Sequence, residues 1–153
     1  MQKTFLPISI DITDKKILIV GGGKVAFHKA GILSRFTDKA TVVSPHFHEG
    51  FTTLPFVLVK KKYESADLDG ALLVYICTGD KALNRQIKTD CEKWGILASV
   101  CDNPALCDFV SPAVYKEDNV TIAVSSNAEN VRQSIAIRNQ IRLLAENKML
   151  ITQ

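Results

Sequence analysis

The sequence lacks any apolar run long enough to cross a membrane as a helix, so we expect no membrane-embedded part. Its first residues, MQKTFLPISIDITD, include acids and a proline where a signal peptide needs an unbroken apolar segment. Internal repeats, low-complexity segments and long linkers are also absent. With 153 residues, 46% of them hydrophobic, the chain can bury a sizeable core. We therefore expect a folded cytoplasmic protein.

The sequence also lacks a strong excess of either charge. Nineteen Lys and Arg stand against 16 Asp and Glu, which gives a net charge of +3. A weak, dispersed positive charge suits a small anionic ligand but does not indicate a nucleic-acid partner. The one basic run, Lys60–Lys62, follows a β-rich stretch and is typical of a solvated strand edge.

Cysteine and histidine patterns that would signal a metal or a disulfide framework are missing. The four cysteines show no CxxC spacing, and we expect them to be reduced thiols (Cys77, Cys91, Cys101 and Cys107). His46 and His48 form an H-x-H pair without a third ligand nearby, which favours surface histidines over a metal site. No metal cofactor is expected.

Strand-like and helix-like segments alternate through the first hundred residues. Short apolar or β-branched runs predict strands at 16–20, 40–44, 56–63, 71–78 and 96–100. Apolar spacing of three or four predicts helices at 24–36 and 81–94. This order is typical of an α/β fold with a Rossmann-like parallel sheet and right-handed crossovers.

The alternation of strand-like and helix-like segments ends after Val100. Residues 101–114 are expected to form a loop, residues 119–126 a strand and residues 130–147 a final helix. We therefore predict two parts, a Rossmann-like domain at 1–110 and a small strand–helix segment at 111–153.

Three glycines follow the first predicted strand. Gly21, Gly23 and Ala26 give the pattern G-x-G-x-x-A between a strand and a helix, which is the context of a dinucleotide fingerprint. Gly21 permits the tight turn, Gly23 allows a pyrophosphate to approach, and Ala26 lets the helix pack closely. The alternative is a glycine turn that only packs strand against helix.

A dinucleotide site usually has an Asp or Glu at the end of the second strand that hydrogen-bonds the ribose, and this residue is missing here. Ser44 occupies that position, and no arginine lies near it. A serine hydroxyl can still hydrogen-bond a ribose hydroxyl, and the absent arginine favours NAD over NADP.

Four segments resemble one known family, in the same order. They are VGGGKVAFHKAGIL (20–33), TGDKALN (78–84), SVCDNPALCDFVSPAV (99–114) and NVTIAVSS (119–126). They are similar to segments of the NAD-dependent precorrin-2 dehydrogenase and sirohydrochlorin ferrochelatase family, the N-terminal module of siroheme synthases. The resemblance covers about residues 5–126.

The resemblance implies roles for individual residues. Asp102 falls on the family's proposed catalytic aspartate. The other implied positions are a cofactor loop (Gly21, Gly22, Gly23, Lys24 and Val25), a segment beside the nicotinamide (Thr78 and Asp80) and a tetrapyrrole pocket (Ser126 and Arg138). Taken without the resemblance, Asp102 is typical of a turn cap, and Thr78 and Asp80 of a helix cap. Asp108 aligns with no proposed catalytic position, and we expect its replacement to matter less.

The implied activity is the oxidation of precorrin-2 to sirohydrochlorin with NAD+, with Asp102 as general base. Partial burial would raise the pKa of Asp102 usefully. The resemblance also implies a homodimer built from residues 110–147, and ferrous iron as a chelation substrate.

The chain departs from the family after the last motif. It reads NAENVRQSIAIR (127–138) where the family usually has G-G-x-S-P-x-L-A-R, and it ends at Gln153 where family members often carry a further helical domain. Two alternatives therefore stay open: an NAD(H)-binding sensory or regulatory module, and a family member that binds its ligands without turnover.

Overall fold

The protein is described by a computed structural model that covers residues 3–150. The described chain divides into two compact units. One unit is residues 9–109, and the other combines residues 3–8 with residues 110–150. The sequence placed a boundary near residue 110 but assigned residues 3–8 to the first part.

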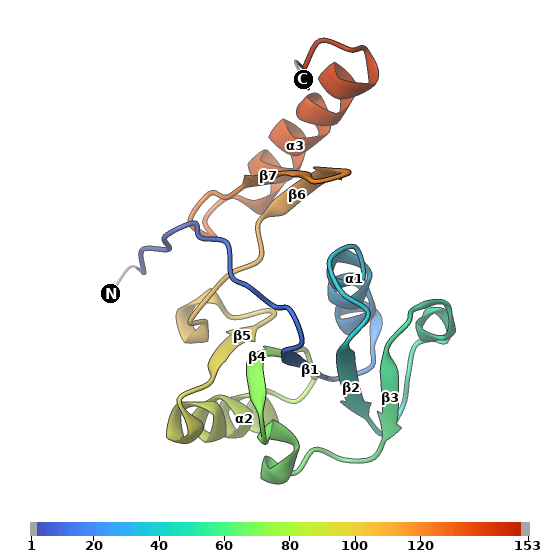
Figure 1. Ribbon diagram of the computed structural model, residues 1–153. Helices are drawn as coiled ribbons and strands as arrows, with labels where there is room; N and C mark the ends of the chain where they lie inside the picture. Colours follow the sequence, from blue (N-terminus) through green and yellow to red (C-terminus); the bar gives the residue numbers. More distant parts are fainter. Residues whose placement is uncertain (1–2, 151–153) are drawn as a thin grey trace. The chain divides into compact units, whose positions relative to one another are not determined.

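The first unit contains a five-stranded parallel sheet (Figure 1). Its strand order is β3-β2-β1-β4-β5, so β3 and β5 are the edges. The strands are β1 (Lys16–Val20), β2 (Ala40–Ser44), β3 (Val57–Lys60), β4 (Ala71–Ile76) and β5 (Leu97–Val100). The predicted α/β, Rossmann-like architecture is confirmed.

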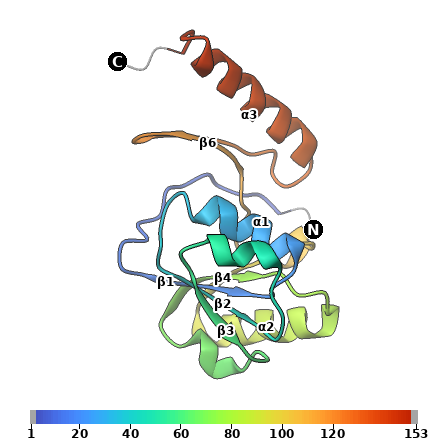
Figure 2. The ribbon, with the colours of Figure 1, turned by 90° about the vertical axis from the view of Figure 1, so that its right-hand side faces the viewer.

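Two helices cover opposite faces of this sheet, as Figure 2 shows. Helix α1 (Lys24–Leu33) buries Ala26 and Ala30 in the same cluster as Ile17 and Ile19 of β1. Helix α2 (Lys81–Trp94) buries Ile87 and Cys91 on the other face. Alternate residues of β1 face opposite sides of the sheet, and both sides are covered, which explains why residues 17–20 are all apolar.

Helix α1 is shorter than the sequence suggested. It ends at Leu33, and the next three residues turn back on it through hydrogen bonds such as Phe36 N to the Leu33 carbonyl, at 2.9 Å. The predicted extension to Phe36 is wrong because Phe36 is exposed and does not pack on the sheet.

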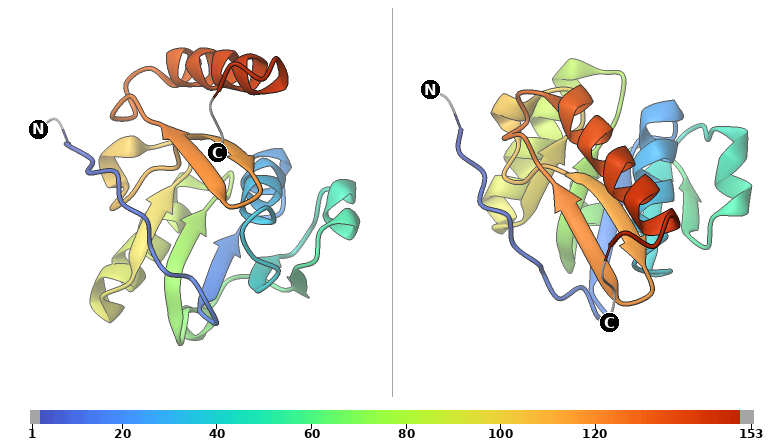
Figure 3. Two further views of the ribbon diagram at one scale, coloured as in Figure 1. Left: turned by 45° about the horizontal axis from the view of Figure 1, so that its top comes forward. Right: turned by 90° about the horizontal axis from the view of Figure 1, so that it is seen from above.

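The second unit is a β-hairpin with a helix along it, as Figure 3 shows. Strands β6 (Ala113–Glu117) and β7 (Val120–Val124) pair antiparallel, and helix α3 (Val131–Glu146) packs against both. Strand β6 starts within residues 101–114, which were expected to form a loop.

The turn between β7 and α3 has an unusual backbone. Asn127 and Ala128 both have left-handed φ angles, of 55° and 62°. They occupy the positions of the paired glycines in the related family, so the backbone conformation that glycine favours is present without glycine. Asn127 gains two hydrogen bonds there, accepting from Phe5 N at 2.8 Å and donating to the Lys3 carbonyl at 2.7 Å.

Replacing Ala128 with glycine is therefore expected to stabilise the protein. The Ala128 Cβ makes a left-handed conformation costly, and relief of that cost should contribute about 1 kcal/mol. Chemical denaturation of both proteins measures the effect. Asn127→Gly is the matched control. It also removes a side chain from a residue with a left-handed φ angle, but it loses the hydrogen bonds of Asn127 to Lys3 and Phe5. A destabilised Ala128→Gly variant contradicts the prediction.

Candidate functional site

The glycine turn after β1 is closed in by the ends of its two neighbouring strands. Gly21 has a φ of 119°, and a Cβ there would lie 2.4 Å from the carbonyl oxygen of Cys77. A Cβ on Gly22 would lie 2.0 Å from the carbonyl oxygen of His46 and 2.8 Å from Ser44 Oγ. The fold itself therefore requires glycine at both positions.

Gly23 differs from the two glycines before it. A Cβ built on Gly23 meets no atom within 4 Å, and its φ of −81° is accessible to any residue. It is the N-cap of α1, and that end of the helix has no side-chain cap and no acid in its first turn. Space in front of an uncapped helix N-terminus fits a pyrophosphate, so a nicotinamide dinucleotide suits the residues present.

The rest of the first turn of α1 agrees with this arrangement. Ala26 is completely buried, which lets the helix lie close to the sheet. Lys24 and Val25 are exposed at the same end. Their predicted contact with the cofactor stays a prediction.

Ser44 lies at the end of β2, behind Gly22. It is buried, and its hydroxyl donates to the carbonyl of His46 at 2.7 Å. The proton of this hydroxyl is therefore engaged within the chain, and only its oxygen can serve a ribose as an acceptor. The role of Ser44 in ribose binding stays a prediction.

Thr78 and Asp80 form the start of α2. The Asp80 carboxylate accepts from the amides of Ala82 (2.8 Å) and Leu83 (3.1 Å), which makes it an N-cap. Asn84 is buried and donates to the Thr78 carbonyl at 3.1 Å, so the last residue of TGDKALN folds back onto the first. No role for Asn84 was predicted from the sequence. The helix-cap role left open for both residues is present for Asp80, whereas Thr78 Oγ1 accepts from Asp80 N at 3.2 Å and caps no amide of the helix. Contact of either residue with the nicotinamide stays a prediction.

Asp102 follows the end of β5, the strand beside β4. The side chain is exposed, and none of the described residues forms a hydrogen bond or ion pair with its carboxylate. It does not cap the local turn, which is closed by Asn103 N donating to the Val100 carbonyl at 3.0 Å. The prediction that Asp102 is partly buried is wrong, because its side chain is exposed in the described structure.

Two cysteines next to these site residues are joined. Cys77 and Cys101 form a disulfide, whereas Cys91 and Cys107 are buried thiols that are not part of it. The expectation of four reduced thiols is therefore wrong for this pair. Ile76 and Val100 are register partners on β4 and β5, so the next residue of each strand lies beside the other.

Ser126 and Arg138 belong to the second unit. Ser126 Oγ accepts from Asn130 N at 3.0 Å. Arg138 on α3 donates from Nε to Asn139 at 2.9 Å and from Nη1 to the Val114 carbonyl at 3.3 Å. The predicted roles of both residues in binding a tetrapyrrole stay predictions.

His48, the second residue of the H-x-H pair, has structural contacts in the first unit. His48 Nδ1 accepts from Gly50 N at 3.1 Å, and its ring stacks on Phe27 with a centroid separation of 4.9 Å. Within residues 3–150, no cluster of three His, Cys, Asp or Glu side chains could hold a metal ion.

One lysine near the site was not identified from the sequence. Burial lowers the pKa of Lys29 on α1, while the nearby Cys107 thiol opposes that shift. Lys29 is half-buried, which its position in the sequence did not indicate.

Helices of membrane-spanning length and hydropathy do not occur in the described part of the chain.

Curated proteins named siroheme synthase are similar to this chain. The Psychrobacter sp. (strain PRwf-1) protein is 35% identical over 127 residues, covering 80% of this chain and 26% of that protein. The Methylobacillus flagellatus protein is 33% identical over 146 residues, covering 91% of this chain and 31% of that protein. The chain thus spans about a quarter to a third of the length of these relatives, and the resemblance expected from the four motifs is confirmed.

A solved structure titled "SirC, precorrin-2 dehydrogenase" has the same fold. It matches 90% of this chain and 69% of its own with a TM-score of 0.77, at 19% sequence identity.

A family model described as "Putative NAD(P)-binding" matches residues 8–113, which include all five strands of the parallel sheet, the glycine turn and Asp102. A nicotinamide dinucleotide is thus confirmed as the class of cofactor. The chain belongs to this NAD(P)-binding family.

Proposed function

We propose that the protein oxidises precorrin-2 to sirohydrochlorin with NAD+, as a precorrin-2 dehydrogenase of siroheme biosynthesis. The observation that carries the proposal is the exposed Asp102 carboxylate, which has no hydrogen bond or ion pair with any of the described residues. It follows the carboxyl end of β5, and the glycine turn with the uncapped helix α1 follows the carboxyl end of β1. Ligands of open parallel sheets bind at the carboxyl ends of the strands, where both features lie. The siroheme synthase relatives and the precorrin-2 dehydrogenase structure support the choice of substrate.

Each part of the site has a task in this reaction. The cofactor, when bound, would serve as the hydride acceptor. Gly21–Val25 would hold its pyrophosphate, and the Thr78–Asp80 segment would border its nicotinamide end. Asp102 would take the proton that the tetrapyrrole loses, because a carboxylate without an internal partner is available as a base. Arg138 and Ser126 would bind the tetrapyrrole, whose carboxylates suit a guanidinium.

NAD is the cofactor proposed over NADP. Ser44 and Pro45 stand where a 2′-phosphate would need an arginine.

The direct test mixes the purified protein with precorrin-2 and NAD+. Sirohydrochlorin and NADH should appear in equal amounts, and NADP+ should be a poorer oxidant. Binding of NAD+ without turnover would contradict the enzyme and support an NAD(H)-binding sensory or regulatory module. Adding ferrous iron to the product mixture tests the second part of the family activity, with iron as a chelation substrate. We place this reaction in the cytoplasm as part of the proposal.

We also propose that the protein is a homodimer joined through its second unit. The hairpin and α3 leave several large apolar side chains between 39% and 62% exposed (Val120, Val131, Ile135, Ile137, Leu143 and Leu144). Apolar surface of this extent on one small unit is typical of a covered interface.

Sedimentation of the protein at micromolar concentration is expected to show a dimer. Leu143→Glu should shift it toward the monomer, because the charge would be buried without a partner. Gln140→Glu, an exposed polar position on the same helix, is the matched control. A wild type that sediments only as a monomer rules out this assembly.

A further inference from the structure

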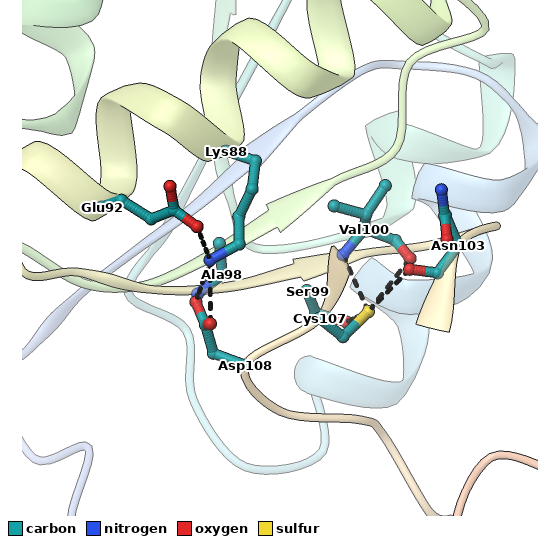
Figure 4. A network of polar contacts seen from close by, with 8 residues as sticks. All are labelled: Lys88, Glu92, Ala98, Ser99, Val100, Asn103, Cys107 and Asp108. Carbon is teal, nitrogen blue, oxygen red and sulfur yellow. Dashed lines mark hydrogen bonds and ion pairs between the residues drawn. The ribbon is translucent and has the colours of Figure 1, made fainter. Parts of the chain in front are cut away.

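The outer edge of β5 is covered by two side chains. As an edge strand, β5 would leave the amides of Ala98 and Val100 open to solvent or to another strand. Figure 4 shows that Ala98 N donates to Asp108 Oδ2 at 3.0 Å and that Val100 N donates to Cys107 Sγ at 3.1 Å. The returning chain completes the ladder, with Asp108 N donating to the Ala98 carbonyl at 2.8 Å and Cys107 Sγ to the Val100 carbonyl at 3.2 Å.

Lys88 of α2 fixes the carboxylate that makes this contact. Its Nζ lies 2.8 Å from both oxygens of Asp108 and 3.0 Å from Glu92 Oε1 (Figure 4). The Lys88 side chain is only 8% exposed, whereas Asp108 is 28% exposed. Burial lowers the pKa of Lys88, but its hydrogen bonds to Asp108 and Glu92 outweigh burial and raise the pKa above its usual value. The ion pair is therefore charged and joins α2 to the segment after β5.

These contacts close a short loop around Asp102. The chain leaves β5 at Val100 and returns to the same strand at Cys107, and Cys107 Sγ also donates to the Asn103 carbonyl at 3.4 Å. Asp102 lies in this loop, and its carboxylate has no hydrogen bond or ion pair with any of the described residues. Its position therefore depends on the residues on either side: Cys101, which the disulfide to Cys77 holds at the start of the loop, and the anchors at residues 107 and 108 at its end.

We propose that Asp108, paired with Lys88, is the positioning residue for Asp102: it holds the 101–107 loop closed so that the Asp102 carboxylate keeps its place at the sheet edge. The catalytic part of this inference rests on the proposed function. Loop closure itself does not, so the two can be tested separately.

The first test follows the reactivity of the Cys107 thiol. The native protein, without reductant, is treated with a thiol reagent, and the labelling of Cys107 and Cys91 is followed by peptide mass spectrometry. Asp108→Asn keeps the shape of the side chain but cannot accept twice from Lys88, and Lys88→Met removes the other partner. Both variants should label Cys107 at least tenfold faster than wild type.

The pair of variants separates loop opening from a change in thiol pKa. Loss of a negative charge lowers a nearby thiol pKa, whereas loss of a positive charge raises it. Faster labelling of Cys107 in both variants therefore requires an open loop. Cys91, which α2 buries completely against the sheet, reports any general loosening. Glu92→Gln should behave as wild type, because the Glu92 side chain is 62% exposed and its amide replacement can still accept a hydrogen bond from Lys88. Wild-type rates at Cys107 in both variants overturn the proposal.

The second test asks whether Asp108 acts through Asp102. Asp108→Asn should lower kcat by about tenfold while NAD+ affinity stays within about twofold of wild type. In an Asp102→Asn background the same substitution should cost nothing further, because the group that it positions is gone. An additive loss contradicts positioning. If wild type shows no turnover at all, the proposed function fails, and the labelling alone decides whether the pair holds the loop.

Discussion

Replacing Gly23 with valine is expected to abolish NAD+ binding while leaving the fold intact. A side chain at this position would extend into open space, since no atom of the chain lies within 4 Å of a Cβ there. That space lies in front of the uncapped first turn of α1, where a pyrophosphate would sit. Valine is a weaker N-cap than glycine, so a loss of stability of up to about 1 kcal/mol is expected.

Calorimetry with NAD+ and thermal unfolding of the same samples measure the two effects. Gly22→Ala is the contrasting variant, because its Cβ would lie 2.0 Å from the carbonyl oxygen of His46. That variant should lose stability by several kcal/mol, and any loss of binding would follow from the damaged turn. Equal NAD+ affinity of Gly23→Val and wild type would show that the third glycine serves no ligand, and the cofactor site would have to lie elsewhere.

The parallel sheet could be predicted because each of its strands carries its own signal. Buried parallel strands are apolar on both faces, so KILIV and ALLVYI are recognisable without knowledge of their neighbours. The glycine turn is equally local, since Gly21 needs its left-handed φ angle whatever the ligand. The need for Gly22 could not be predicted, because the atoms that exclude a side chain belong to Ser44 and His46 at the end of β2.

The contacts that were missed join residues far apart in the chain. Cys77 and Cys101 are 24 positions apart and become neighbours only because β4 and β5 are adjacent in the sheet. Lys88 and Asp108 are 20 positions apart, and neither belongs to a motif that pairs them. No local pattern encodes either contact, and both follow from strand order.

The conformation of residues 127 and 128 reduces the weight of the departures from the family pattern. Loss of two glycines was one of the departures that left open a family member without turnover, yet the residues at both positions keep left-handed φ angles. Asn130 replaces the usual serine as N-cap of α3, accepting from Gln133 N at 3.0 Å. The turn that leads into α3 is therefore built from different residues with the same backbone requirements, which favours the enzyme over a degenerate relative.

Asp102→Asn is expected to lower the rate of precorrin-2 oxidation by about a hundredfold or more. The amide has nearly the same shape as the carboxylate but cannot accept the proton that the tetrapyrrole loses. Because the Asp102 carboxylate has no hydrogen bond or ion pair among the described residues, its replacement should leave the melting temperature and the NAD+ affinity at wild-type values. Turnover is measured by NADH absorbance, and NAD+ affinity by calorimetry.

Asp69→Asn is the control that suits this comparison. Asp69 is also exposed, and its hydrogen bonds are made by its backbone: the carbonyl accepts from Lys16 Nζ at 2.7 Å, and the amide donates to the Ala66 carbonyl at 3.2 Å. Asp108 would be a poor control, because its carboxylate anchors the loop that carries Asp102. An Asp102→Asn enzyme as fast as the Asp69→Asn enzyme would remove the general-base role and leave the NAD+ site at the glycine turn standing. A large loss confined to Asp102→Asn would place proton transfer on this carboxylate, since fold and cofactor binding would be unchanged.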